Sequence, residues 1–245
     1  MKFDSMTDRG SVRTENQDSV FVTQMRSKSC LAAVVCDGMG GAHGGKLASE
    51  LAVSAYMAEL RRVLIEHQEK KPDFAPIMDA ACKAANDIVY GYSISNTENA
   101  GMGTTLVAVT IRGRNAEIIN IGDSRAYLIE RKKISQITLD HSVVQGLVAR
   151  GDITPEEARY HPQKHLITRA IGVDPVVEAD HYHVHMRLGS KLLLCSDGLS
   201  NTLRDDELLA LCIESRHPDR ICRRLIQSAL DRGAGDNITA AVIQI

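Results

Sequence analysis

Four aspartates in this sequence stand next to short apolar runs, where a carboxylate is unusual. Asp37 follows LAAVVC, Asp123 follows IINIG, and Asp197 follows LLLCS. Asp236 lies just before the C-terminal run TAAVIQI. Such runs are typical of core strands, so we expect all four carboxylates to lie partly buried at strand ends. One such aspartate alone would usually be a turn or helix-cap residue, but four together indicate a shared function.

Buried carboxylates that meet at one place lose hydration and repel one another, so their pKa values rise unless cations hold them. The ligand atoms would all be oxygens. Oxygen ligands favour a hard divalent ion such as magnesium, manganese or calcium over a zinc ion held by thiolate or imidazole. The aspartates therefore predict a divalent-metal site.

A polar motif precedes the first of these aspartates. In RTENQD, Arg13 and Asp18 flank four residues just before the alternating run SVFVTQ. A guanidinium is planar and permanently charged, and it can bind a phosphate through two hydrogen bonds. We expect Arg13 to bind a phosphate group and Asp18 to hold a metal-bound water.

The hydrophobic pattern predicts the elements that carry these residues. Consecutive antiparallel strands are expected at 104–111, 116–122, 126–130 and 133–138, where short β-rich runs are separated by turn signals. Further strands are expected at 31–36, 181–187, 191–195 and 239–245. Because strands outnumber helices and come in blocks, the pattern favours an α+β layered domain over a parallel sheet. The polar segment 140–180 is expected to form an excursion on the surface.

Apolar residues at helical spacing predict two helices in the first half of the chain. The first would present Leu47, Leu51, Ala55 and Ala58 on one face. The second would bury Phe74, Ile77, Met78, Ala81, Ala85, Ile88, Val89 and Tyr92. Two more helices are expected between 195 and the terminal strand.

Composition limits the kind of protein. A chain of 245 residues with 44% hydrophobic content can bury one sizeable core, which predicts a single domain over 1–245. The formal net charge of −2 gives no support for binding nucleic acid or an acidic membrane surface. No signal peptide or membrane span is visible, so we expect a soluble cytoplasmic protein. The six cysteines form no C-x-x-C pair and are expected to be reduced and buried.

Taken together, these motifs resemble those of the metal-dependent protein phosphatases, the protein phosphatase 2C family, in its bacterial form. The matching blocks run in the family's order along the whole chain: TDRGSVRTENQD, VCDGMGG, GMGTTLVAV, NIGDSRAYLI, TLDHSVVQGLVARGDIT, HLITRAIG, LLLCSDGLSN and GDNITAAVI. The resemblance implies an αββα sandwich, in which two antiparallel β-sheets are flanked by helices. It also implies a flap at about 141–172 beside a metal site at one end of the sheets.

The resemblance implies a role for each metal-site residue. Asp37 would bridge two divalent ions, Mn²⁺ or Mg²⁺, and the Gly38 carbonyl would ligate one of them. Asp197 and Asp236 would complete the other ion's ligands, and Asp18 would act through water. A weaker third ion would be held by Asp123 together with Asp197.

The implied activity is hydrolysis of phosphoserine and phosphothreonine by direct attack of a metal-activated water, with Arg13 binding the phosphate. The partners would be phosphorylated proteins, the substrates of a Ser/Thr protein kinase, and the chain would act as a monomer. No covalent phosphoenzyme is required, and no cysteine is followed at the sixth position by arginine, as a cysteine phosphatase needs.

This sequence departs from the family pattern in the glycine-rich turn. Met39 stands where animal members carry a histidine proposed as a general acid, so the leaving group must be protonated by another group, for which a metal-bound water is one candidate. Ala42 and Lys46 stand where bacterial relatives usually place His and Glu, and His43 comes one position late. None of these changes removes an expected metal ligand.

Histidines elsewhere provide two further hypotheses. Four in loop or flap-like segments are candidates for proton transfer: His43, His141, His161 and His165. His181, His183 and His185 alternate, so they would share one face of a strand, which we interpret as a polar outer face rather than a transition-metal site.

Two alternatives to a phosphatase stay open. Gly40 to Lys46 spells G-x-x-x-x-G-K between a predicted strand and a predicted helix, the setting of a nucleotide-binding P-loop. The next residue is Leu47, however, and a P-loop needs Ser or Thr there to ligate magnesium. The second alternative is a catalytically inactive phosphatase fold that serves as a binding module.

Overall fold

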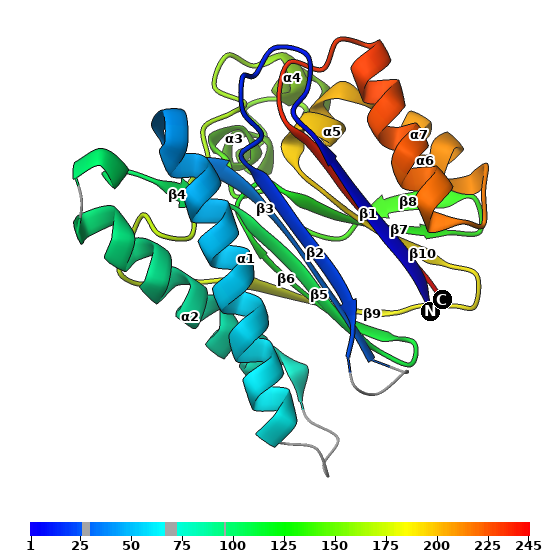
Figure 1. Ribbon diagram of the computed structural model, residues 1–245. Helices are drawn as coiled ribbons and strands as arrows, with labels where there is room; N and C mark the ends of the chain where they lie inside the picture. Colours follow the sequence, from blue (N-terminus) through cyan, green and yellow to red (C-terminus); the bar gives the residue numbers. More distant parts are fainter. Residues whose placement is uncertain (26–29, 67–72, 96) are drawn as a thin grey trace.

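Two antiparallel β-sheets packed against each other form the centre of the computed structural model, which describes residues 1–25, 30–66, 73–95 and 97–245 (Figure 1). The side chains of Ala42 and His43 lie outside the described part. Helices cover the outer face of each sheet, so the architecture is the expected αββα sandwich.

The first sheet has the strand order β2-β3-β5-β6-β9, and the short β4 pairs with β3 beside that path. Its strands are β2 (Asp18–Gln24), β3 (Cys30–Met39), β4 (Gly103–Thr104), β5 (Leu106–Arg112), β6 (Asn115–Ile121) and β9 (Asp180–His185). Two long helices, α1 (Gly41–Glu66) and α2 (Phe74–Ser95), pack on its outer face, and a 3₁₀ turn, η1 (Thr97–Asn99), follows α2.

The second sheet has the order β1-β11-β10-β7-β8. Its strands are β1 (Lys2–Asp8), β7 (Arg125–Glu130), β8 (Lys133–Gln136), β10 (Lys191–Cys195) and β11 (Ile238–Gln244). Its outer face is covered by α5 (Asp197–Thr202), α6 (Asp205–Ile213) and α7 (Pro218–Asp231). The first and last strands pair along their whole length, which places both chain ends side by side (Figure 1).

The alternation of side chains along β3 explains why its apolar run is continuous. Leu31, Ala33 and Val35 point into the core between the sheets, whereas Ala32 and Val34 point toward α1 and α2. Both faces of this strand are therefore buried, as is typical of a strand that reads as an unbroken hydrophobic run.

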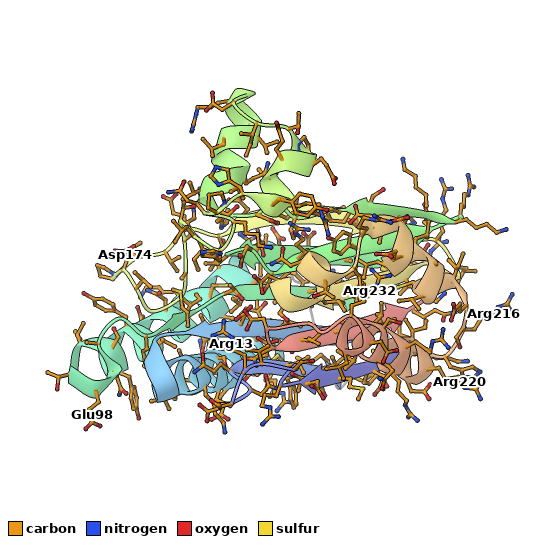
Figure 2. All side chains as sticks on the ribbon, turned by 90° about the horizontal axis from the view of Figure 1, so that it is seen from above. Arg13, Glu98, Asp174, Arg216, Arg220 and Arg232 are labelled. Carbon is orange, nitrogen blue, oxygen red and sulfur yellow. The ribbon has the colours of Figure 1, made fainter. Side chains whose placement is uncertain are left out.

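The segment 141–172 contains two short helices, α3 (Val143–Arg150) and α4 (Pro155–Tyr160). Figure 2 shows this pair standing off the layered body. Ser142 caps α3, and Thr154 forms a capping box with Glu157 at the start of α4. An isolated β-bridge between Ser142 and Ile167 closes the segment on itself, and a second bridge, between Thr104 and Ile171, ties it to the sandwich.

The expected strands are present, with ends shifted by a few residues, and the strand expected at 104–111 is divided between β4 and β5. The alternating run SVFVTQ forms β2, for which no strand was predicted, and β1 was not predicted either. Its sequence, KFDSMTD, is mostly polar because it is an edge strand that β11 pairs on one side only. Three helices rather than two follow β10, since α5 begins immediately after Ser196. The expectation that Asp37 follows its strand is also wrong, because pairing with β4 extends β3 to Met39.

The predicted helix faces need correction. Ala58 is exposed, and α1 buries Ala48, Ala52 and Ala55. Ile88 and Tyr92 of α2 are 41% and 49% exposed. Asn86 is buried on the same helix because its side chain binds three backbone groups of 172–175, a tertiary requirement that helical spacing cannot reveal.

The structure also shows where the cysteines and the alternating histidines lie. All six cysteines are buried and unpaired. His181, His183 and His185 lie on an exposed face of β9, and each contacts its own partner: Asp79, Glu117 and Asn115. In the part of the chain described here, no helix is both long enough and apolar enough to span a bilayer.

The core between the sheets should dominate stability. Leu194 is fully buried there, so Leu194→Ala should lower the free energy of unfolding by about 2–5 kcal/mol. Leu188→Ala is the matched control because this leucine is 80% exposed, and it should change stability by less than about 0.5 kcal/mol. Urea unfolding of both variants measures the difference. Equal effects would contradict this account of the core.

Candidate metal and phosphate site

The register of β2 and β3 brings two carboxylates together. Asp18 lies directly opposite Asp37 in this antiparallel pair. Hydrogen bonds fix both the N–H and the carbonyl group of Asp37. The N–H donates to Thr105 Oγ1 at 2.9 Å. The carbonyl accepts from Thr104 Oγ1 and from Thr105 N, each at 2.9 Å. The position of Asp37 is therefore set by the sheet itself.

Asp18 is held at the junction of the two sheets. Its Oδ2 accepts hydrogen bonds from Ser196 Oγ, directly after β10, at 2.7 Å and from Thr239 Oγ1, in β11, at 2.6 Å. Its Oδ1 is buried and has no hydrogen-bond partner among the described residues. A buried carboxylate oxygen without a partner is costly, and a cation or its bound water would satisfy it.

Two glycines allow the loops of the site to approach each other closely. A Cβ on Gly38 would lie 2.0 Å from the Gly45 carbonyl oxygen, at the start of α1. A Cβ on Gly198 would lie 2.0 Å from the Asn237 carbonyl oxygen. Neither position accepts a larger side chain without moving the backbone. The residue after Asp37 and the residue after Asp197 are thus small because their neighbours must pack against them.

Asn237 organises the loop that carries Arg13. Its side-chain oxygen accepts from Gln17 N at 2.8 Å, and its side-chain nitrogen donates to the carbonyls of Arg9 and Glu15 at 2.8 and 3.0 Å. One amide thus ties three points of the N-terminal loop to the residue after Asp236. Sequence reasoning missed this role, as it missed those of Ser196 and Thr239.

Arg13 and Asp236 form a bidentate ion pair. Nε donates to Oδ1 at 2.8 Å and Nη2 donates to Oδ2 at 2.9 Å. Both side chains are accessible, with 57% of Arg13 and 44% of Asp236 exposed. The guanidinium therefore already binds a planar anionic group at the mouth of the site.

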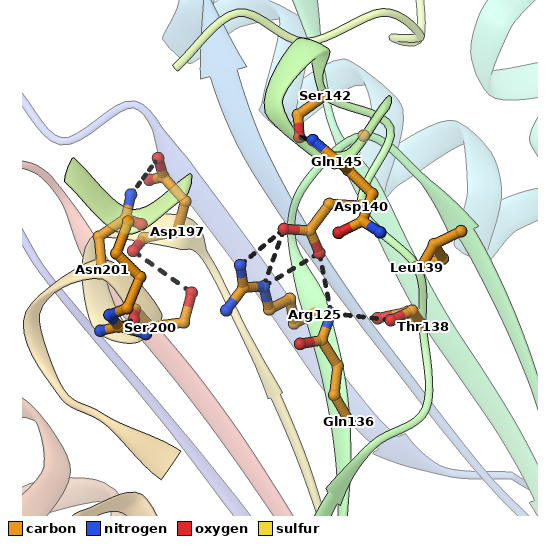
Figure 3. A network of polar contacts seen from close by, with 12 residues as sticks. Arg125, Gln136, Thr138, Leu139, Asp140, Ser142, Gln145, Asp197, Ser200 and Asn201 are labelled. Atoms are coloured by element: carbon orange, nitrogen blue, oxygen red, sulfur yellow. Dashed lines mark hydrogen bonds and ion pairs between the residues drawn. The ribbon is translucent and has the colours of Figure 1, made fainter. Parts of the chain in front are cut away.

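Asp123 lies beside a second network, at the base of the 141–172 segment. Arg125 forms a largely buried ion pair with Asp140, at 2.6 Å between Nη2 and Oδ2, and Gln136 donates to the same carboxylate at 2.9 Å (Figure 3). Next to Asp123, the Gly122 N–H donates to Nδ1 of His141 at 3.1 Å. His141 therefore fixes the loop of Asp123 and is itself only 6% exposed.

The predicted site residues line one cavity, with Asp18 behind it. The cavity wall includes Arg13, Asp37, Gly38, Asp123, Asp197 and Asp236. On Asp197, Oδ2 accepts from Asn201 Nδ2 at 2.9 Å (Figure 3). Within the described residues, no three His, Cys, Asp or Glu side chains are placed to hold an ion as they stand. Asp236 faces Arg13, so coordination would require this carboxylate to turn.

Burial and mutual repulsion shape the proton affinity of the carboxylates. Burial raises the pKa of Asp18 to about 7, although the hydroxyls of Thr239 and Ser196 oppose the shift. Burial, then repulsion from Asp18 and Asp197, raises the pKa of Asp37 well above its ordinary value. The pKa values of Asp123 and Asp197 are raised first by burial and then by neighbouring aspartates. All these causes favour a divalent cation, and the all-oxygen donor set fits Mn²⁺ or Mg²⁺.

Two packed antiparallel sheets with outer helices and carboxylates gathered at one end define an αββα protein with a cation site. Residues 8–225 match the family model described as protein phosphatase 2C. The chain belongs to the protein phosphatase 2C family.

Several relatives are similar over most of this chain. The serine/threonine protein phosphatase PstP of Mycobacterium tuberculosis is 38% identical over 100% of this chain, which spans 45% of the length of PstP. The serine/threonine phosphatase stp of Listeria monocytogenes is 34% identical over 97% of this chain and 93% of its own length. A crystal structure of the PstP catalytic domain in complex with two manganese ions superposes with a TM-score of 0.84 at 36% identity, covering 98% of this chain and 96% of that one.

The raised pKa of Asp18 predicts how pH changes the stability of the metal-free protein. Between about pH 4 and pH 7 the folded protein binds more protons than the unfolded chain, so its stability should fall as pH rises through this range. Asp18→Asn abolishes the charge. In EDTA it should raise the unfolding free energy at pH 8 by roughly 1–3 kcal/mol, with a smaller gain at pH 5.

Urea unfolding at the two pH values checks this, with Asp174→Asn as control because Asp174 is an exposed aspartate outside the site. An Asp18→Asn variant that is no more stable than the wild-type protein at pH 8 would contradict the raised pKa.

The Arg13–Asp236 pair predicts how Arg13→Ala changes metal affinity. Removing the guanidinium frees Asp236 and makes the site more negative. Because the pair is exposed, we expect manganese to bind only about two- to fivefold more tightly. Calorimetric titration measures this, with Arg62→Ala as control, since Arg62 forms the same bidentate pair with Glu59 on α1. Weaker binding in Arg13→Ala would show that Arg13 supports the ions.

Proposed function

We propose that this chain is a metal-dependent protein serine/threonine phosphatase that hydrolyses phosphoserine and phosphothreonine in phosphorylated proteins. The observation that carries the proposal is the single cavity shared by the Arg13 guanidinium and the carboxylates of Asp37, Asp123, Asp197 and Asp236. A phosphate ester needs both a cationic fork for its oxygens and charge neutralisation at phosphorus. The relatives named as serine/threonine phosphatases support the same activity.

The site residues fit two divalent ions, Mn²⁺ or Mg²⁺. Asp37 would bridge them, with the Gly38 carbonyl, Asp197 and Asp236 as further ligands and Asp18 acting through water. Such ions, when bound, supply an activated water and neutralise charge on the phosphate. The PstP structure with two manganese ions supports this assignment. A weaker third ion would lie at Asp123 and Asp197.

Arg13 would bind the substrate phosphate. It lies at the cavity mouth, and its two donors already hold the two oxygens of Asp236 in the geometry that a phosphate would adopt. A phosphate would replace Asp236 as the partner of the guanidinium when Asp236 turns to its ion.

Direct attack by water, without a covalent intermediate, is supported by the cysteines. All six are buried, and burial raises the pKa of every one of these thiols, which keeps them protonated and poor nucleophiles.

The nucleotide hydrolase alternative has little support. The stretch that resembles a P-loop is not a loop, because α1 begins at Gly41. Lys46, which would have to reach phosphates, instead lies 3.6 Å from a carboxylate oxygen of Glu15. An inactive binding module is also disfavoured, since the predicted acidic residues are brought together at the cavity.

We further propose that residues 1–245 act as one catalytic domain, because the two sheets share one buried interface. Segment 141–172 would be its flap. The chain would work as a cytoplasmic monomer on proteins phosphorylated by a Ser/Thr protein kinase, and the net charge of −2 gives no reason to expect nucleic acid or membrane as a partner.

One assay tests the activity directly. Hydrolysis of a phosphothreonine peptide should be abolished by EDTA, restored by manganese or magnesium, and lost in Asp197→Asn. ATP hydrolysis should stay negligible, and Lys46→Ala should keep peptide turnover within a few-fold of wild type. Turnover that persists without metal would overturn the proposal. Appreciable ATPase activity that Lys46→Ala removes would instead establish the nucleotide hydrolase.

A further inference from the structure

Hydrolysis of a serine or threonine phosphate releases an alkoxide, which is a poor leaving group unless it is protonated as the bond breaks. Met39 at the cavity wall cannot donate a proton. The Arg13 guanidinium stays charged and does not act as an acid. The lining aspartates would be deprotonated as metal ligands. Glu15 also lines the cavity, but its carboxylate is paired with Lys46 at 3.6 Å. A different group must supply the proton.

His165 is the histidine that lines this cavity among the described residues. Lysine, tyrosine and cysteine are missing from its described lining. Histidine is the side chain best suited to donate a proton near neutral pH. Of the histidines that the sequence offered for proton transfer, the structure thus selects His165 over His141 and His161, and the side chain of His43 lies outside the described part.

The backbone around His165 is fixed, so the imidazole is presented to the cavity from the 141–172 segment. Leu166 N donates to the Gln163 carbonyl at 3.1 Å, and the Leu166 carbonyl accepts from Val143 N at 2.9 Å. Ile167, which also lines the cavity, forms a β-bridge with Ser142. The carboxylates reach the cavity from the sheet ends and His165 reaches it from the flap.

His165 also differs from the other histidines of this segment in its contacts. His141 accepts from the Gly122 N–H, and His161 accepts from the Gln163 N–H at 3.2 Å. Neither lines the cavity. In the described structure the exposed imidazole of His165 has no hydrogen-bond or ion-pair partner, so both ring nitrogens are free to contact a substrate.

We propose that His165 is the general acid of the reaction. The inference rests on the phosphatase activity proposed above. The oxygen of water forms a bond to phosphorus as the ester P–O bond breaks, and the electron pair of that bond goes to the leaving serine or threonine oxygen. This oxygen takes a proton from the imidazolium of His165. The neutral imidazole regains a proton from solvent, into which the attacking water has released one, so the products are the free hydroxyl and inorganic phosphate.

The acidity of the leaving group separates this role from a structural one. 4-Nitrophenolate is a stable anion and leaves without a proton, whereas a threonine alkoxide does not. His165→Gln should therefore lower kcat/KM on a phosphothreonine peptide roughly a hundredfold. Its kcat/KM on 4-nitrophenyl phosphate should stay within about twofold of the wild-type value. The loss on phenyl phosphate should lie between the losses on these two substrates.

His161→Gln is the matched control, since it changes a neighbouring histidine that does not line the cavity. Its kcat/KM on the peptide and on 4-nitrophenyl phosphate should be nearly that of the wild-type protein. Manganese affinity of both variants, measured by calorimetry, should equal that of the wild-type protein. The general-acid role would be overturned if His165→Gln lowered kcat/KM equally on all three esters, or if it left kcat/KM on the peptide unchanged. Failure of the proposed function is distinguishable, because the wild-type protein would then hydrolyse none of the esters.

Discussion

The structure depends on holding mutually repelling carboxylates at the junction of two β-sheets. Asp18 and Asp37 face each other across one strand pair, and Asp197 and Asp236 approach from the other sheet. Nearby cations compensate only part of this charge, because Arg13 pairs with Asp236 alone and Asp140 already neutralises Arg125. The remaining negative charge can be stabilised only by protons or by ions from outside. The cavity is therefore a cation receptor by construction.

Repulsion between these carboxylates destabilises the folded protein, so the rest of the fold must be stable enough to compensate for it. The core between the sheets supplies that stability through residues buried on both sheets, such as Val35, Leu194 and Ala241. The destabilising and the stabilising interactions lie at different places. Repulsion between carboxylates is confined to one end of the sandwich, whereas apolar burial extends along all of it. This separation lets the sandwich keep a site that would destabilise a smaller core.

Sequence patterns predicted the apolar strands and the aspartates next to them because both signals are local. The partners of these aspartates are not local. Thr239 and Ser196 lie 221 and 178 positions from Asp18, and no periodicity connects them. The same holds for Asn86, whose burial depends on backbone groups of 172–175. What the sequence could not provide is therefore the set of polar contacts that long-range folding creates.

Asp37 and Asp123 have different anchors, and both anchors contact the 141–172 segment. Asp37 is fixed by strand pairing and by hydrogen bonds to Thr104 and Thr105, all within the sheet. Asp123 follows a strand, and the glycine before it is held by His141 at the base of the flap. The 141–172 segment also reaches the anchor of Asp37, because Ile171 bridges Thr104, whose hydroxyl donates to the Asp37 carbonyl. The sheets and the 141–172 segment therefore position these carboxylates together, through Thr104 for Asp37 and through His141 for the loop of Asp123.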